Sequence, residues 1–133
     1  MAYGGKLWVF GGERASVAFN DVWSLDMKGA KAAAAAAAGG AVLGTWEYVV
    51  PASFTSPPPR HAHAAVVVGD KLFIHGGKRG GASGDALADA WAFDLQTLEW
   101  KLLTEASLTG ARFGHSVAYV AGLHKFNPVE PIA

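Results

Sequence analysis

Short apolar runs, each bounded by Gly, Asp or Pro, recur along the chain and set its pattern. Four of them are almost wholly apolar: LWVF at 7–10, AAVVVG at 64–69, LFIH at 72–75 and SVAYVA at 116–121. Runs of this length between turn residues predict β-strands. Because most are apolar at both alternating positions, we expect strands covered on both faces, as inside a stack of sheets. Two mixed segments, WEYVV at 46–50 and WKLL at 100–103, indicate strands nearer the solvent.

The same strings are written twice, in the same order. KLWVFGG at 6–12 returns as KLFIHGG at 71–77, NDVWSLD at 20–26 as ADAWAFD at 88–94, TWEYVV at 45–50 as EWKLLT at 99–104, and PRHAHAAVVVG at 59–69 as ARFGHSVAYVAG at 111–122. A period of about 50 residues is typical of stacked supersecondary units. Each unit predicts four strands: one after Arg-x-x-His, one ending at Gly-Gly, one at Asp-x-Trp-x-x-Asp and one at the later Trp.

The repeat divides the chain into three parts. We assign a first unit to 1–50, without its first strand, a second unit to 51–104, and the first strand of a third unit plus an irregular tail to 105–133. The first unit is longer because of the alanine-rich stretch at 28–44. We expect a loop insertion there, because so short a run of alanines is marginal as an isolated helix. A docking helix is the alternative, but the run has no amphipathic face.

Taken together and in order, these marks resemble the Kelch repeat. They are the double glycines, the aromatic residue after each, the spaced tryptophan and the Arg-x-x-His that opens the next unit: Gly11, Gly12, Gly76, Gly77, Trp23, Trp91, Trp46, Trp100, Arg60–His63 and Arg112–His115. The resemblance covers residues 6 to about 121. It implies an all-β fold of Kelch-type β-propeller blades, each a four-stranded antiparallel sheet. Because a propeller typically needs four to eight blades, we interpret the chain as an incomplete propeller, a fragment or a piece completed by other polypeptide.

Several of these residues would have a physical role in a blade. Paired glycines tolerate positive φ and suit the sharp turn at the end of the second strand. Arg60 and Arg112 carry several donors that can hold loop carbonyls between blades. The aspartates beside the third strand suit side-chain hydrogen bonds in turns: Asp21, Asp26, Asp89 and Asp94.

Charge and composition narrow the function. Eleven Lys and Arg balance eleven Asp and Glu, so no net field attracts nucleic acid or an anionic membrane. The absence of Cys excludes disulfides, thiolate nucleophiles and Cys-ligated metals. The start of the chain lacks the pattern of a signal peptide, and no long run of bulky apolar residues follows. We therefore expect a soluble, cytoplasmic protein without a nucleic-acid or membrane partner.

Candidate metal chemistry rests on a single His-x-His. His61 and His63 would face the same side of a strand, where their two imidazoles could coordinate one metal ion. In the repeat, however, His63 aligns with His115 and His61 with Phe113. This alignment favours packing positions, and no third ligand is evident because His75 lies on another predicted strand. We expect no metal and no cofactor.

Catalytic motifs are also weak. KRGGASGD at 78–85 lacks the Gly-Lys-Ser/Thr ending and the following helix of a phosphate-binding loop. No spacing supports a Ser-His-Asp arrangement or a carboxylate pair. Copper radical oxidases of propeller shape rely on a Cys joined to a Tyr, and this chain has no Cys. We therefore expect no catalysis by this chain alone.

The resemblance implies a protein–protein interaction module or scaffold. The loops at 13–19 and 78–85 take the same place in the two units but share no chemistry, as variable binding loops do. The candidate binding residues are Glu13, Arg14, Lys78, Arg79, Arg60 and Arg112. Two alternatives stay open: a structural subunit completed by other chains in a large assembly, or part of a propeller enzyme or carbohydrate-acting protein.

An incomplete propeller also leaves apolar faces open. Trp8, Phe10, Val67, Phe73 and Tyr119 are predicted to lie on or near faces without cover. Large exposed apolar patches are rarely left bare, and unpaired strand edges promote association. We therefore expect the chain to oligomerise, to aggregate, or to associate with further propeller blades or other chains.

Overall fold

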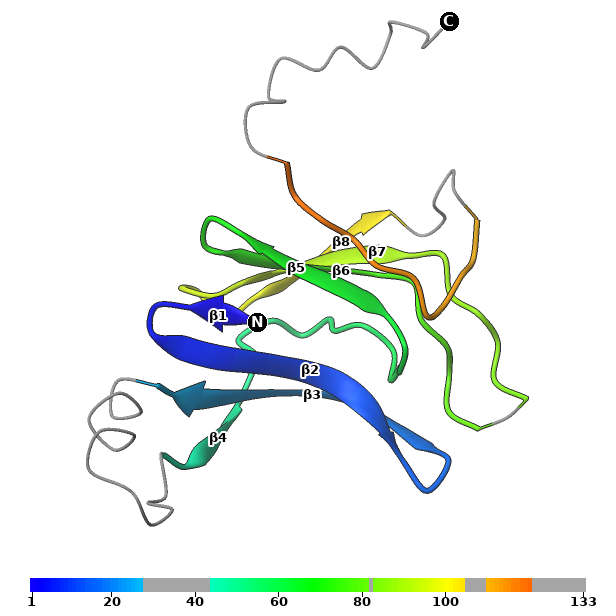
Figure 1. Ribbon diagram of the computed structural model, residues 1–133, viewed down its shortest axis with the longest axis horizontal. Coiled ribbons are helices and arrows are strands. Elements are labelled where there is room, and N and C mark those ends of the chain that lie inside the picture. The colour runs from blue at the N-terminus through cyan, green and yellow to red at the C-terminus, as the bar shows by residue number, and fades with distance from the viewer. Residues whose placement is uncertain (28–43, 82, 105–109, 121–133) are drawn as a thin grey trace, which may run out of the picture.

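The computed structural model describes residues 1–27, 44–81, 83–104 and 110–120. These residues form two four-stranded antiparallel sheets, with strand orders β1-β2-β3-β4 and β5-β6-β7-β8 (Figure 1). Every strand pairs with its neighbour in sequence, as in a meander. The prediction of an all-β chain with two four-stranded blades is confirmed, and the two sheets do not close a propeller. No helix in the described part of the chain is long and apolar enough to cross a membrane.

The first sheet contains a first strand that sequence analysis had left out. It comprises β1 (Ala2–Tyr3), β2 (Lys6–Arg14), β3 (Val17–Asp26) and β4 (Trp46–Val49). β1 is short, but Met1 extends its pairing with β2. The Trp8 amide donates to the Met1 carbonyl at 2.6 Å, and the Met1 amino group donates to the Trp8 carbonyl at 2.9 Å. These bonds satisfy backbone groups on the edge of β2, which is why so short a strand forms.

The double glycine of the first unit does not end its strand, contrary to the prediction. β2 continues through Gly11 and Gly12 to Arg14, with a bulge between Phe10 and Gly12. Both glycines have positive φ, 60° and 112°, which the bulge requires. The β2–β3 hairpin therefore bends beyond the bulge and extends past the part of β3 that pairs with β4 (Figure 1).

The second sheet comprises β5 (Ala64–Val68), β6 (Lys71–His75), β7 (Ala90–Asp94) and β8 (Trp100–Thr104). Here the strand does end at the double glycine, as predicted. The two sheets have the same register: Leu72 pairs with Phe93 and Ile74 with Trp91, as Leu7 pairs with Leu25 and Val9 with Trp23. The repeat in the sequence is thus a repeat of one sheet.

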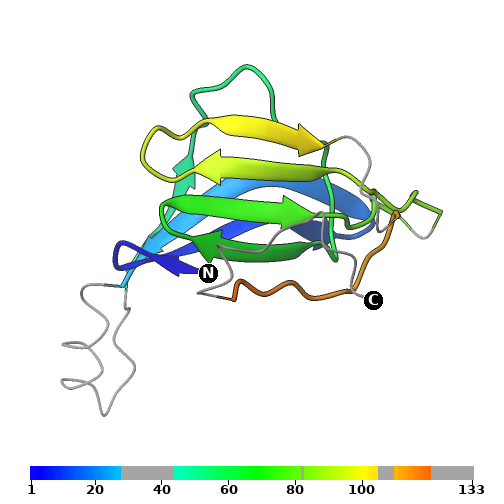
Figure 2. The ribbon, with the colours of Figure 1, turned by 90° about the horizontal axis from the view of Figure 1, so that it is seen from above.

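The two sheets pack face to face with the hydrophobic core between them (Figure 2). The first sheet contributes Trp8, Phe10, Val22 and Val49, and the second contributes Leu72, Ile74, Trp91, Phe93 and Trp100. The Trp100 ring lies 4.9 Å from the Phe10 ring and 4.7 Å from the Phe93 ring, measured between centroids. This corrects the expectation that Trp8 and Phe10 are uncovered, since they are only 6% and 4% exposed. Val67 also packs partly against this core.

The segment predicted as the first strand of a third unit is not a strand. Residues 116–120 form no strand in the structure, and Val117, Tyr119 and Val120 are exposed. A strand needs a neighbour for its backbone groups, and the described residues offer none at this place. Tyr119 lies uncovered as expected, at 56% exposure. The alanine-rich stretch at 28–43 and the tail from 121 onward lie outside the described residues.

Candidate partner-binding site

Arg60 fastens the two sheets together where they meet. Its side chain has no exposed surface, and its two terminal nitrogens, Nη1 and Nη2, donate to the two oxygens of the Asp89 carboxylate at 2.6 and 2.7 Å. It also donates to the Gly76 carbonyl at 2.9 Å. The Arg60 backbone is meanwhile bound to the first sheet, because its amide donates to the Phe19 carbonyl at 3.0 Å. Arg60 therefore holds a loop carbonyl between blades, as predicted, but it is not accessible as a binding residue.

Asp89 is held as a carboxylate by its neighbours. Burial raises the pKa of Asp89, but hydrogen bonds from Arg60 and from the Trp91 indole outweigh burial and bring the pKa below its usual range. The Trp91 Nε1 donates at 2.8 Å. A bidentate Arg–carboxylate pair of this kind fixes the orientation of both side chains. Asp89 is thus a paired anion at the junction.

The backbone of this junction occurs a second time. At the first junction, Gly12 donates to the Arg60 carbonyl at 2.9 Å. At the second, Gly77 donates to the Arg112 carbonyl at 2.8 Å, and the Arg112 amide donates to the Leu87 carbonyl at 3.1 Å. The Arg-x-x-His segment at 112–115 therefore docks on the second sheet as the segment at 60–63 docks on the first.

The histidines of these segments act as packed rings. The His63 ring lies 5.2 Å from Phe10, and the His115 ring lies 5.0 Å from His75, so the two histidines take equivalent places, as their alignment in the repeat predicts. His75 Nδ1 and His115 Nε2 are 2.9 Å apart and share one hydrogen bond. Burial, aided by the charge of Arg60, lowers the pKa of His63 to about 4. Among the described residues, no three His, Asp or Glu side chains gather to hold a metal ion.

The tip of the β2–β3 hairpin and the β6–β7 connection meet at one end of the sheets (Figure 1). The Gly81 amide donates to Glu13 Oε1 at 2.9 Å, which ties one connection to the other. Lys78 Nζ lies 5.3 Å from the centroid of the Phe113 ring, close enough for a cation–π contact. We call this surface the loop face and define it by Glu13, Arg14, Lys78, Arg79 and Phe113.

The loop face has the chemistry of a protein-binding surface. Arg14 and Arg79 are exposed, and Phe113 is 53% exposed. Glu13 is partly engaged, because His61 Nδ1 lies 3.7 Å from its carboxylate. Cations and an exposed aromatic ring therefore dominate the surface. Arg and aromatic residues are enriched where proteins bind each other.

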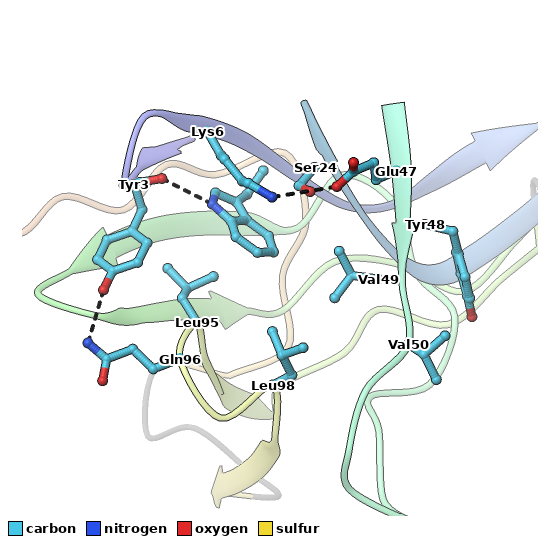
Figure 3. A pocket seen from close by; sticks show the side chains of 12 residues that line it. Tyr3, Lys6, Ser24, Glu47, Tyr48, Val49, Val50, Leu95, Gln96 and Leu98 are labelled. Carbon is cyan, nitrogen blue, oxygen red and sulfur yellow. Dashed lines mark hydrogen bonds and ion pairs between the residues drawn. The ribbon is translucent and has the colours of Figure 1, made fainter. Parts of the chain in front are cut away.

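A cleft of about 600 Å³ lies between the sheets near Lys6, at the other end of β2 from Glu13 (Figure 3). Its walls are mainly apolar: Trp8, Val49, Val50, Leu95 and Leu98. Its polar groups are bound to each other. Lys6 lies 3.5 Å from Glu47, and Gln96 donates to the Tyr3 hydroxyl at 3.3 Å. The cleft thus offers a ligand little beyond apolar contact.

Two comparisons with known proteins agree with this geometry. Residues 1–126 match the family described as the KLHDC2/KLHL20/DRC7 Kelch-repeats domain. The chain belongs to the Kelch-repeat family. Its sheets are therefore Kelch units, and its domain class supports protein–protein interaction.

This Kelch chain is also similar to segments of much longer curated proteins. It is 36% identical over 109 residues to "Tip elongation aberrant protein 3" of Schizosaccharomyces pombe, covering 71% of this chain and 9% of that protein. It is 27% identical over 117 residues to "Rho GTPase-activating protein gacHH" of Dictyostelium discoideum, covering 84% and 7%. It is 35% identical over 65 residues to "Acyl-CoA-binding domain-containing protein 6" of Oryza sativa subsp. japonica, covering 49% and 10%. The chain spans about a tenth or less of the length of these relatives.

The structure places the predicted binding residues in two different settings. Glu13 lies beside the β6–β7 connection and Lys78 beside Phe113, whereas Arg60 is buried at the junction. The turn role expected of the aspartates holds for Asp94, whose Oδ1 accepts from the amides of Gln96 and Thr97 at 2.8 and 3.0 Å.

The role of two other aspartates was missed. Asp21 and Asp89 each accept from the indole of the tryptophan two positions later, at 2.7 and 2.8 Å. The Asp-x-Trp spacing carries this signal, because side chains two apart on a strand lie on one side.

Proposed function

We propose that this Kelch chain binds a partner protein through the loop face. The observation that carries the proposal is a contrast between the units. The two backbone bonds that dock the Arg-x-x-His segment recur at both junctions, yet the connections that follow the double glycines share neither length nor chemistry. A constant frame with differing connections is the arrangement in which loops carry the binding function.

The loop face favours a partner with acidic and apolar side chains. Lys78 lies over the Phe113 ring, Arg14 and Arg79 are exposed on the connections that meet here, and Glu13 accepts from Gly81 and is approached by His61. A carboxylate of the partner would meet Arg14 or Arg79, since Arg binds carboxylates in a bidentate manner. An apolar side chain of the partner would rest against the exposed part of the Phe113 ring, as an anchor in the middle of the contact.

A random peptide library displayed against the immobilised chain tests this proposal. We expect the selected peptides to be rich in Asp or Glu next to an apolar residue. Their affinity should fall about tenfold or more in Arg79→Ala and Phe113→Ala, as for residues at the centre of an interface.

Matched controls keep the library test sharp. Lys6→Ala removes a cation at the far end of β2, and Phe54→Ala removes an aromatic ring that is fully exposed outside the loop face. Both should bind the selected peptides like the unaltered chain. Peptides whose binding is indifferent to Arg79→Ala and Phe113→Ala would contradict the proposal.

We further infer that the chain acts by binding rather than by catalysis. Three of its described histidines are held by other rings: His63 contacts Phe10 edge-on, and His75 shares a hydrogen bond with His115. The fourth, His61, lies 3.7 Å from the Glu13 carboxylate. A general base must be free to reach a substrate proton. Turnover of a substrate by the purified chain, abolished by replacing one His or Asp, would refute this inference.

A further inference from the structure

The outward face of the first sheet repeats residues that the second sheet buries. Strand register places Leu7, Val9, Trp23, Leu25, Trp46 and Tyr48 on the face turned away from the second sheet. Their counterparts in the repeat lie on the face turned toward the first sheet, and all but Leu102 are buried: Leu72, Ile74, Trp91, Phe93, Trp100 and Leu102. Val9 is 39% exposed and Ile74 1%, while Trp46 is 46% exposed and Trp100 4%. An open copy of a buried surface is therefore present on the molecule.

The outward face of the second sheet repeats the other half of that contact. Phe73, Ala92 and Leu103 line a hollow of about 500 Å³ on this face. Their counterparts in the first sheet, Trp8, Ser24 and Val49, line the cleft between the sheets. The two hollows are thus the same surface, once facing a neighbouring sheet and once without one.

The β7–β8 turn, which enters the cleft between the sheets, also has a counterpart in the first sheet. Leu95, in the β7–β8 turn, lines the cleft of the first sheet and is 6% exposed. Met27 follows β3 as Leu95 follows β7, and it is 40% exposed. Both amides make the same bond, Met27 to the Gly5 carbonyl and Leu95 to the Asp70 carbonyl, each at 2.8 Å. Met27 is therefore an apolar residue presented for a hollow of the same kind.

A charge on the rim completes the complementarity. The Asp89 carboxylate accepts a hydrogen bond from the Trp91 indole and is paired with the Arg60 guanidinium. The Asp21 carboxylate likewise accepts a hydrogen bond from the Trp23 indole, but no cation among the described residues pairs with it. The first sheet thus offers a carboxylate at the place where an incoming Arg-x-x-His segment carries its arginine.

We propose that a second copy of this chain docks on these faces, with the outward face of the second sheet of one copy against the outward face of the first sheet of the other. Met27 of one copy then fills the hollow around Phe73 and Leu103 of the other, as Leu95 fills the cleft within one copy. In the copy that presents its second sheet, Arg112 lies beside Asp21 of the other copy. Residues 116–120 of that same copy reach the edge of β2 in the other copy, where they replace the short β1.

This contact is head-to-tail, so it uses a different face of each copy. Such contacts form rings when the rotation closes. Propellers typically hold four to eight sheets, and each copy brings two. A ring built from pairs of the two described sheets therefore closes with about two to four copies. The proposal concerns the sheet faces and is independent of partner binding at the loop face.

Two variants that block one face each provide the test. Tyr48→Lys places a charge on the outward face of the first sheet, and Leu103→Lys on that of the second; the two residues are 54% and 48% exposed, so the fold should tolerate both changes. Sedimentation velocity over a dilution series should show a discrete assembly for the unaltered chain and monomers for each variant. An equimolar mixture of the variants should form a one-to-one dimer and nothing larger, because one unblocked contact remains.

Controls and contrary outcomes follow from the same design. Phe54→Lys alters an exposed apolar residue outside both faces and should assemble like the unaltered chain, and circular dichroism should show the same sheet content for all variants. A monomeric unaltered chain would overturn the proposal. So would a Leu103→Lys chain that still dimerises by itself, which would indicate a symmetric contact. A mixture of the two variants that stays monomeric would overturn it as well.

Discussion

The strings KLWVFGG and KLFIHGG form corresponding strands, but the side chains of those strands have opposite surroundings. In β2, Trp8 and Phe10 face the core while Val9 looks outward; in β6, Ile74 faces the core while Phe73 looks outward. The strands are equivalent in register, so the difference comes from their place in the stack. Each unit carries two apolar faces, and a unit buries only the face that has a neighbour.

The two spaced tryptophans make the same comparison with a single residue type. Trp100 lies among Phe10, Trp91 and Phe93 with 4% of its surface exposed. Trp46, its counterpart, is 46% exposed. A repeat therefore defines what a position can bury, and the neighbouring sheet defines whether it does so.

The tryptophan pair gives the largest expected effect on stability. Trp100→Ala should lower the free energy of unfolding by about 3–5 kcal/mol, as removal of a large core ring does. Trp46→Ala should cost less than about 1 kcal/mol, because half of its surface already meets water. Urea unfolding of both variants in the Leu103→Lys background, where self-association is blocked, provides the measurement. Equal losses would contradict the assignment of the two faces.

Arg60 and Arg14 offer the next contrast, between a buried and an exposed arginine. Arg60→Ala removes a fully buried side chain and leaves the partly buried Asp89 carboxylate with only the Trp91 indole as a side-chain donor. Breaking a buried pair typically costs about 3–5 kcal/mol, and the partial exposure of Asp89 places the expected loss at the lower end. Arg14→Ala, at the exposed hairpin tip, should change stability by no more than about 0.5 kcal/mol. Thermal melts followed by circular dichroism distinguish the two. A mild Arg60→Ala variant would show that the junction does not depend on this pair.

Acid should weaken the junction through His63. The pKa of His63 is about 4 in the folded chain against 6.5 for an ordinary His. Between these values the unfolded chain binds a proton that the folded chain does not, so stability is full above about pH 6.5 and falls as the pH drops toward 4. The loss is at most roughly 3 kcal/mol, and less for a ring that retains some contact with solvent.

Unfolding titrations between pH 8 and pH 4 measure this slope. His63→Phe removes the titrating group while keeping an aromatic ring in the slot, so its stability should depend less on pH over this range. An unchanged slope in His63→Phe would assign the pH dependence to other groups, such as His75, whose pKa is also lowered by burial and by His115.

The double glycines give the smallest expected difference between two matched variants. Gly12 and Gly77 both have positive φ, 112° and 98°, so an alanine costs about 1–2 kcal/mol of backbone strain at either place. An added Cβ at Gly77 would lie 2.8 Å from the His61 carbonyl oxygen, whereas at Gly12 it would meet nothing within 4 Å. Gly77→Ala should therefore lose about 1–3 kcal/mol more than Gly12→Ala in the same urea experiment. A reversed order would contradict the close packing of His61 and His63 against Gly77.

The strands and the two units could be predicted because apolar runs, turn residues and the repeat all agree. The sequence could not predict which face of a strand packs against the next sheet. Both alternating positions of β2 are apolar, so the sequence alone does not show that Trp8 faces the core while Val9 faces outward. The error about Trp8 and Phe10 has this cause.

The details of the site that sequence reasoning missed depend on contacts between distant residues. Arg60 was expected at a binding loop, but its guanidinium is directed inward by Asp89, twenty-nine positions later in the chain. The charges that define the loop face could be located in the connections after the double glycines, and their role in binding stays a prediction. Phe113 was predicted only as a packing position, and its place beside Lys78 depends on how the second junction folds.

The most direct test compares Val9 with Ile74, equivalent positions on the two sheets with 39% and 1% exposure. The chain has no Cys, so Val9→Cys and Ile74→Cys each provide a single thiol whose rate of modification reports its exposure. In the Leu103→Lys background, the thiol at position 9 should react many times faster than the thiol at position 74. Without that block, assembly should slow the reaction at position 9. Equal rates at the two positions in the blocked background would contradict the account, because the outward face of the first sheet would then be as covered as the inward face of the second.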